Sequence, residues 1–415
     1  MQTDHPVWTI SPNWEGGVLE RLEWLTDVIV SDSADEQRRS VRWSPRRSFE
    51  MTINPANEDR TYVDLALHRL GATEWLMPLW HDQATLDIGA GAGFNVLNID
   101  NTFREFRPGD FAILYQDTFT WEVVSIASMT DTTLELTGGV EQGWPAGTLV
   151  YPLRIMTVSD ETNLAALSSR IGQSVLLWTV NEANDYVEIP PAGPQYQGAP
   201  ILAIEPDRSR DLTAQHVRFM FEQDGSLGLR KRVAQVDRAF SVRSHSWMVR
   251  GRQAQHGLRG MLYWMQGRQR SVWLPTFNQD LTLTKAVPAG TNDITIRKIG
   301  IGYIGGGPIP GRARFWTGQE VVLHASNQAA PTAKEELLRS AAPVASSYAP
   351  GASWSFLEPA RLNQDNVEIK HYADSAGVAE CAVTFQTFPN DREVPMPIYT
   401  PIPISAKTAG ACGDI

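Results

Sequence analysis

The side chains best suited to chemistry in this sequence are a His-Asp pair, a group of carboxylates and scattered histidines. His81 and Asp82 are adjacent and could act as an acid–base pair. Glu15, Glu20 and Glu23 are close in sequence, but such a grouping is more typical of a solvated segment than of a glycosidase site. The histidines lack the paired His or Cys spacing of metal sites, and no Gly-x-Ser-x-Gly nucleophile occurs. The sequence therefore predicts no catalytic, cofactor-binding or metal-binding residue, and no cofactor.

A glycine-rich stretch, Leu86-Asp-Ile-Gly-Ala-Gly-Ala-Gly93, resembles the first motif of S-adenosylmethionine-dependent methyltransferases. In that family a strand ends in a glycine-rich turn and a helix follows. Here residues 94–100 have the pattern of a short strand, and no series of βαβ units comes after them. We therefore expect an inter-strand loop. A methyltransferase remains a remote alternative, together with a glycan hydrolase.

The elements that would position these residues occur twice along the chain. Trp75-Leu76 matches Trp273-Leu274, and Asp82 matches Asp280, at an offset of 198 residues. Thr85-Leu86 matches Thr282-Leu283 at an offset of 197. Such ordered matches favour an internal duplication, in which Trp75 and Trp273 are buried at equivalent places. We expect the structural anchors of the two related domains to be Trp75, Pro78, Asp82, Trp273, Pro275 and Asp280.

Short apolar runs between turn signals predict a mainly β chain with two related β-sandwich or barrel-type domains. Four runs, at 111–115, 121–126, 133–136 and 148–151, predict a small antiparallel barrel or sandwich. Two segments, 62–70 and 246–266, are helical candidates. The predicted domains are a first β-rich domain over 1–186 with a barrel-like insertion at about 94–152, a Pro-rich linker over 187–206, a second domain over 207–388 and an extended Pro-rich arm over 389–415.

Composition excludes several classes of protein. The chain has 415 residues, of which 42% are hydrophobic and 20% charged, so it is neither disordered nor fibrous. No run of 18 apolar residues and no secretory signal occur, so we expect no membrane partner. A net charge of −11 argues against direct DNA binding. Fourteen tryptophans favour extensive contact surfaces.

Arginines are concentrated in two segments of this acidic chain. Residues 229–270 contain ten basic side chains against one acid, and a second group lies at 38–47. One interpretation is a positive surface for an acidic partner or passing nucleic acid. We favour ion pairs between subunits, because arginine binds carboxylates in bidentate fashion. The expected interface residues are Arg46, Arg47, Arg230, Arg232, Arg250 and Arg252, with Pro395 and Pro401 of the arm.

Three segments carry sets of short motifs. The first, 24–50, contains Trp-Leu-Thr-Asp, then Glu-Gln-Arg-Arg, then Pro-Arg-Arg-Ser-Phe-Glu; the others are 271–280 and 367–380. Together these segments resemble tail proteins of long-tailed bacteriophages. The resemblance is to tail-tip and distal-tail (baseplate) components. It implies a β-rich structural protein of the virion, assembled in the bacterial cytoplasm, that forms a ring and contacts the tail tube and other tip proteins. It also implies no catalysis.

We therefore expect a ring-forming distal tail protein or baseplate hub that joins the tail tube to tip proteins. Two related domains per chain allow six copies, or three copies with pseudo-sixfold symmetry. The alternative from another class is a carbohydrate- or receptor-binding module of the tail tip, since exposed tryptophan stacks on sugars.

Overall fold

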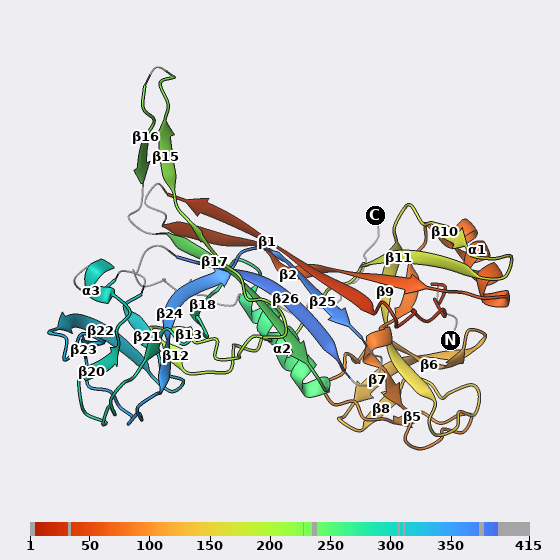
Figure 1. Ribbon diagram of the computed structural model, residues 1–415. Helices are drawn as coiled ribbons and strands as arrows, with labels where there is room; N and C mark the ends of the chain where they lie inside the picture. The colour runs from red at the N-terminus through yellow and green to blue at the C-terminus, as the bar shows by residue number, and fades with distance from the viewer. Residues whose placement is uncertain are drawn as a thin grey trace, which may run out of the picture.

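The computed structural model describes residues 5–31, 35–226, 228–234, 239–304, 308–309, 312–372 and 377–388 (Figure 1). The chain is mainly β with antiparallel pairing throughout its named sheets, which confirms the predicted fold class. Figure 1 shows two small β-barrels at opposite ends of the molecule and a longer sheet between them.

The first half of the chain holds most of one barrel and half of the central sheet. Its elements are β1 (Val18–Val30), β2 (Glu36–Ile53), α1 (Glu58–Leu70), β3 (Trp75–Pro78), the 3₁₀ turn η1 (Trp80–Asp82), β4 (Ala84–Thr85), β5 (Val96–Asn98), β6 (Phe111–Asp117), β7 (Thr120–Met129), β8 (Thr133–Leu136), β9 (Leu149–Val158), β10 (Leu164–Ala166) and β11 (Gly172–Val180).

The second half begins with two short strands and ends with β26. Its elements are β12 (Gln195–Tyr196), β13 (Ala199–Pro200), β14 (Ala214–Val217), β15 (Met220–Gln223), β16 (Lys231–Ala234), β17 (Phe240–Val249), α2 (Arg252–Met265), β18 (Ser271–Pro275), β19 (Leu281–Thr282), β20 (Asp293–Arg297), α3 (Ile301–Ile304), β21 (Arg314–Trp316), β22 (Val321–Gln328), β23 (Glu335–Ser340), β24 (Ser353–Leu362), β25 (Asn366–His371) and β26 (Ala379–Thr387).

The central sheet has the strand order β10-β11-β2-β1-β25-β26-β17-β14. Alternate side chains of each strand point to one face, and on that face they join two buried clusters. Residues of α1 pack on the cluster of the first half, and residues of α2 pack on that of the second. Both helices therefore cover the same face of the sheet, and the opposite face carries the exposed alternate residues.

The strand pairings of the two halves follow one order. In the first half β3 pairs with β9, β9 with β6, β6 with β7, β7 with β8 and β8 with β5. In the second half β18 pairs with β24, β24 with β21, β21 with β22, β22 with β23 and β23 with β20. An isolated parallel bridge also recurs, Val7 with Leu76 and Ile201 with Trp273.

One sequence prediction of local structure needs correction. The helical candidate at 246–266 is a helix only from Arg252, because Ser246 to Val249 continue β17 and pair with β26. The segment predicted as a linker contains the short paired strands β12 and β13, and its Ile201 bridges to Trp273. The four strands predicted for the first barrel are confirmed as β6, β7, β8 and β9.

Candidate assembly site

The two halves of the chain are joined through the pairing of β1 with β25, the β1–β25 junction. It runs from Val18 opposite His371 to Glu23 opposite Asn366. On the exposed face Arg21 donates to Glu368 at 2.9 Å and forms an ion pair with Glu50 at 2.7 Å. The junction thus links a strand of the first half to a strand more than 340 residues further along the chain.

The two outer strands of the central sheet correspond to the two strands of this junction. Strands β2 and β17 correspond, because each leads into the helix of its half, and β14 pairs with β17 as β1 pairs with β2. Strands β11 and β26 correspond, because they pair with β2 and β17, and β10 pairs with β11 as β25 pairs with β26. Within the described residues β14 has no second partner strand, and neither does β10. Residues of β14 are largely exposed, as are two of the three in β10. The sheet therefore ends in two open edges that match the two sides of its own junction.

A buried group of charged side chains, the charge cluster, lies behind the junction. Arg47 Nε donates to Glu20 Oε1 at 2.6 Å, and its NH1 and NH2 groups donate to Glu105 at 2.7 and 2.8 Å. Arg259 of α2 donates to both Glu20 and Glu105. His371 Nε2 donates to Glu20 Oε2 at 2.8 Å. Residues from both halves therefore share the same two carboxylates.

Burial and charge set the protonation of the cluster in a definite direction. Burial opposes ionisation of Glu20, but Arg259 and Arg47, with the hydrogen bond from His371, outweigh it and hold the pKa of Glu20 well below its usual value. Burial lowers the pKa values of His81 and His371, whose rings stack with centroids 4.1 Å apart. Neutral His371 also accepts a hydrogen bond at Nδ1 from Gln255 at 2.8 Å. These directions favour an ionised Glu20 beside the two guanidinium groups, and neutral imidazoles at His81 and His371.

Glu20, His81 and His371 place possible ligand atoms within 4.8 Å of one another, which raises the question of a metal ion. The oxygens of Glu20 are already hydrogen-bonded by Arg47, Arg259 and His371. A divalent cation would face the two guanidiniums at short range, so this donor set does not fit one. The adjoining cavity, lined by His81 and Glu105, has a volume of about 10 Å³, room for a single water and not for a sugar. We interpret the cluster as structural.

The predicted tryptophan anchors are both buried, on corresponding strands β3 and β18, but they differ by one position. Leu76, not Trp75, forms the bridge that corresponds to that of Trp273. A shift of one residue turns a strand side chain to the opposite face. Trp75 accordingly packs against Trp8 and Trp178, whereas Trp273 packs against Tyr196. The prediction of equivalent places is therefore wrong for these two side chains.

The other predicted anchors divide in the same way. Pro78 and Pro275 are both buried and close corresponding strands. Asp82 accepts hydrogen bonds from the Glu105 backbone at 2.6 Å and from Arg252 at 2.9 Å, so it ties the first half to α2 of the second. Asp280 accepts the Phe356 N–H at 2.8 Å, within its own barrel. The two aspartates have different roles.

The arginines expected at a subunit interface lie in three kinds of place. Arg47 is buried in the charge cluster, so its assignment to an interface is wrong: the chain itself supplies its carboxylates. Arg252 is bound to Asp82 within the chain. The remaining four arginines are exposed. Arg232 lies on the β15–β16 hairpin, which projects from the central sheet in Figure 1, and Arg230 lies beside it. Arg46 lies on β2, and Arg250 lies next to α2. Pro395 and Pro401 lie outside the described residues.

Sequence pattern does not single out several members of the charge cluster. The grouping of Glu15, Glu20 and Glu23 predicts a solvated segment, yet Glu20 is fully buried. Its position between Val18 and Leu22 on alternate residues of a strand is the pattern that places it on the covered face. Arg259 and His371 had no comparable pattern, because the pairing that brings them together joins distant parts of the chain.

The glycine-rich stretch is a loop between strands, as expected. Leu86 bridges to Ile99 and Ala90 to Trp144, and both belong to the core of the first barrel. The next element is strand β5, which pairs antiparallel with β8. The strand–turn–helix context that a methyltransferase motif requires is not formed by these residues.

Comparison with protein-family models and with curated proteins returned no match to this chain. Among the described residues no helix has the length and apolar character needed to cross a membrane.

Proposed function

We propose that this chain is a structural, ring-forming subunit of the tail tip of a long-tailed bacteriophage, a distal tail protein or baseplate hub that joins the tail tube to tip proteins. The mainly β fold and the three segments of sequence resemblance at 24–50, 271–280 and 367–380 support this class of protein. In this proposal the two halves descend from one duplicated unit, and the protein works in the virion without catalysis.

The main support for ring formation is the pair of open edges. An edge strand presents unpaired N–H and C=O groups to any strand that can pair with it. Strand β14 occupies the position in the second half that β1 occupies in the first, and β10 corresponds to β25 in the same way. Strand β10 of one copy can therefore pair with β14 of the next copy, as β25 pairs with β1 within the chain. This contact is head-to-tail, and such contacts give closed rings when the rotation closes.

The β1–β25 junction also gives the register of the proposed contact. Glu20 pairs with Ile369 in the junction, and the corresponding residues of the open edges are Ala214 and Leu164. Val18 pairs with His371 in the junction. The corresponding residues are Leu212 of one copy and Ala166 of the next. The proposal therefore places Ala214 of one copy beside Leu164 of its neighbour.

Both halves keep the strands that form the junction, which favours three copies per ring, with six related units. Six copies would be favoured if only one half took part in the ring. Joining tail tube to tip through such a ring requires no bound cofactor.

Cysteine crosslinking tests the proposal. A chain with Ala214→Cys and Leu164→Cys, in a Cys412→Ser background, should form disulfides between copies under mild oxidation, since opposed strand residues lie within disulfide range. Cys381 is buried, and burial raises the pKa of its thiol, so it stays inert. The matched control pairs Leu164→Cys with Glu222→Cys on the projecting hairpin. Chains that remain uncrosslinked at every concentration, or that link equally in the control, would refute the edge contact.

A further inference from the structure

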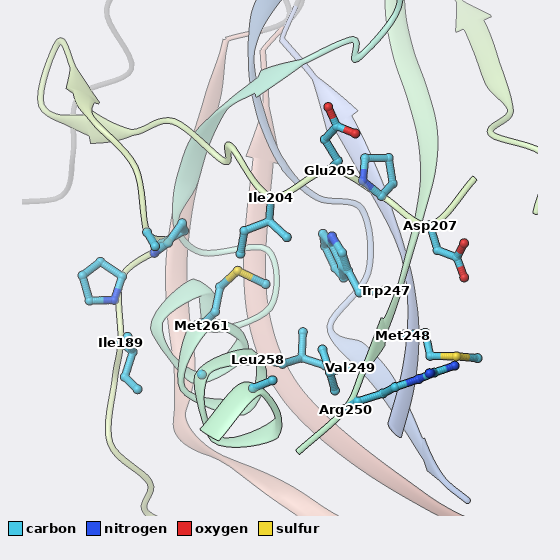
Figure 2. Close-up of a pocket in the computed structure, with 16 residues that line it drawn as sticks. Ile189, Ile204, Glu205, Asp207, Trp247, Met248, Val249, Arg250, Leu258 and Met261 are labelled. Atoms are coloured by element: carbon cyan, nitrogen blue, oxygen red, sulfur yellow. The ribbon is translucent and has the colours of Figure 1, made fainter. Parts of the chain in front are cut away.

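An apolar groove lies between α2 and the strand that leads into it. Its volume is about 630 Å³. The walls come from three segments, 189–192 and 204–207 of the chain before β14 and 247–250 at the end of β17, with the floor formed by α2. Figure 2 shows Trp247, Ile204, Met261 and Leu258 around the opening, with Glu205 and Asp207 at one end.

The corresponding place in the first half is filled. Asn13 N–H donates to the Thr52 carbonyl and Asp207 N–H donates to the Ser246 carbonyl, each at 2.7 Å, so Ile10 and Ile204 occupy the same position of the two halves. Ile10 is 5% exposed and Ile204 is 42% exposed. Trp14 packs against the cluster that contains Ile10, whereas Arg208, at the position of Trp14, turns to the Phe277 carbonyl. The second half thus lacks the side chain that closes the first.

Trp247 lines the groove, but its indole N–H is itself buried. Trp247 is 4% exposed, and its indole N–H has no acceptor among the described residues. A buried tryptophan N–H normally finds one. The groove wall is mostly apolar and includes an aromatic ring, and Pro-rich segments in the polyproline II conformation dock in aromatic-lined grooves.

We propose that this groove binds the chain's own proline-rich segment, Val394-Pro-Met-Pro-Ile-Tyr-Thr-Pro-Ile-Pro-Ile404. These eleven residues contain four prolines and no charge, in a chain that is 20% charged. Pro395, Pro397, Pro401 and Pro403 favour polyproline II, which is preformed and loses little entropy on binding. Arg392 and Glu393 precede the segment in the sequence, and the groove is lined by one charge of each sign that could pair with them, Glu205 and Arg250.

Reach decides between the chain's own groove and that of a neighbour. Ser241 N–H donates to Thr387 Oγ1 at 2.8 Å, so β26 ends beside Ser241. Ser241 lies six residues before Trp247 on β17. Six residues of strand span about 20 Å, and residues 388–394 can extend over at most about 25 Å. In the proposed ring a neighbour's groove lies eight strands away, about 38 Å. The start of the segment, Val394, therefore reaches the chain's own groove but not that of a neighbour.

Photocrosslinking in the full-length chain tests this inference, with p-benzoylphenylalanine in place of Tyr399. We expect crosslinks within one chain, mapped by mass spectrometry to the groove segments or α2. Gly257→Leu should abolish them, because a Cβ at Gly257 meets only open space in the groove. The matched control is Gln253→Leu, an exposed change on the same helix that leaves the groove open.

Two further arms keep the result interpretable. Replacing the four prolines of the segment by serine leaves the folded body unchanged and should also remove the crosslink. Mixing ¹⁵N-labelled and unlabelled chains separates crosslinks within a chain from those between chains. Mixed-label crosslinks, or crosslinks outside the groove, would overturn the inference. Neither outcome bears on the disulfide test of the ring.

Discussion

The two halves of this chain use one order of strand pairing with different side chains inside it. At the position where the first half has Glu20 and Arg47 of the charge cluster, the second has Ala214 and Ser241. At the position of Ile10 in a closed core, the second half has Ile204 at an open groove. The two halves therefore share the same backbone hydrogen-bonding order. The local side chains decide which positions are buried, which carry charge and where a groove stays open.

The difference also explains where the halves meet. The first half places Glu20 at the junction, and its partners Arg259 and His371 come from the second half. At the open edge, Ala214 carries no such charge. An ion cluster therefore accompanies the junction inside the chain, whereas the contact proposed between chains relies on backbone pairing and small side chains.

The largest expected effect is the loss of Glu20. Glu20→Ala leaves Arg47 and Arg259 buried with one carboxylate between them, and breaking a buried ion pair typically costs about 3–5 kcal/mol. We expect a drop of that size in the free energy of unfolding, measured by urea denaturation.

Two controls sharpen this test. Glu23→Ala changes an exposed residue of the same strand, and we expect an effect within about 0.5 kcal/mol. The double variant Glu20→Ala/Arg47→Ser introduces the residues of the second half, and should lose less than the sum of the two single changes because it removes both partners. Strict additivity would mean that the two side chains do not act as a pair.

A second prediction compares the matched isoleucines. Ile10→Ala removes a buried side chain and should cost about 2–5 kcal/mol. Ile204→Ala removes a side chain that is already half-exposed. It should cost about 1 kcal/mol, because burying one methylene group stabilises a protein by about 0.8 kcal/mol. Equal losses in denaturant unfolding would show that the groove is not open in the way described.

A smaller effect is expected from pH. Burial lowers the pKa values of His81 and His371 in the folded protein, whereas in the unfolded chain they titrate near about 6.5. Below that pH the unfolded chain binds more protons, so stability falls as the pH decreases from 7 to 5, by at most about 1.4 kcal/mol per pH unit for each histidine. The lowered pKa of Glu20 adds a further loss only at more acidic pH, below its unfolded value.

His371→Gln isolates the histidine contribution. The variant keeps a hydrogen-bond donor toward Glu20 but cannot titrate, so the slope of unfolding free energy between pH 7 and 5 should become shallower. An unchanged slope would assign the pH dependence to groups outside the cluster.

Much of the fold was accessible from sequence because local patterns encode it. Alternation and turn residues predicted β6 to β9, and the repeated Trp-Leu segments identified β3 and β18 as corresponding strands. Register was not accessible: the match of Trp75 to Trp273 is off by one residue, which in a strand reverses the face. The charge cluster was missed because β1 pairs with β25, a contact across most of the chain that no local pattern encodes.

The most direct test of the proposed assembly is the mass of the purified 415-residue chain in solution, measured by mass photometry over a range of concentrations. If the open edges join copies as the junction joins the halves, the 46.1-kDa chain assembles into a closed species of three copies, about 138 kDa, or its double. A single species at the mass of one chain at every concentration, including in the presence of the Ala214→Cys/Leu164→Cys pair under oxidation, would contradict it.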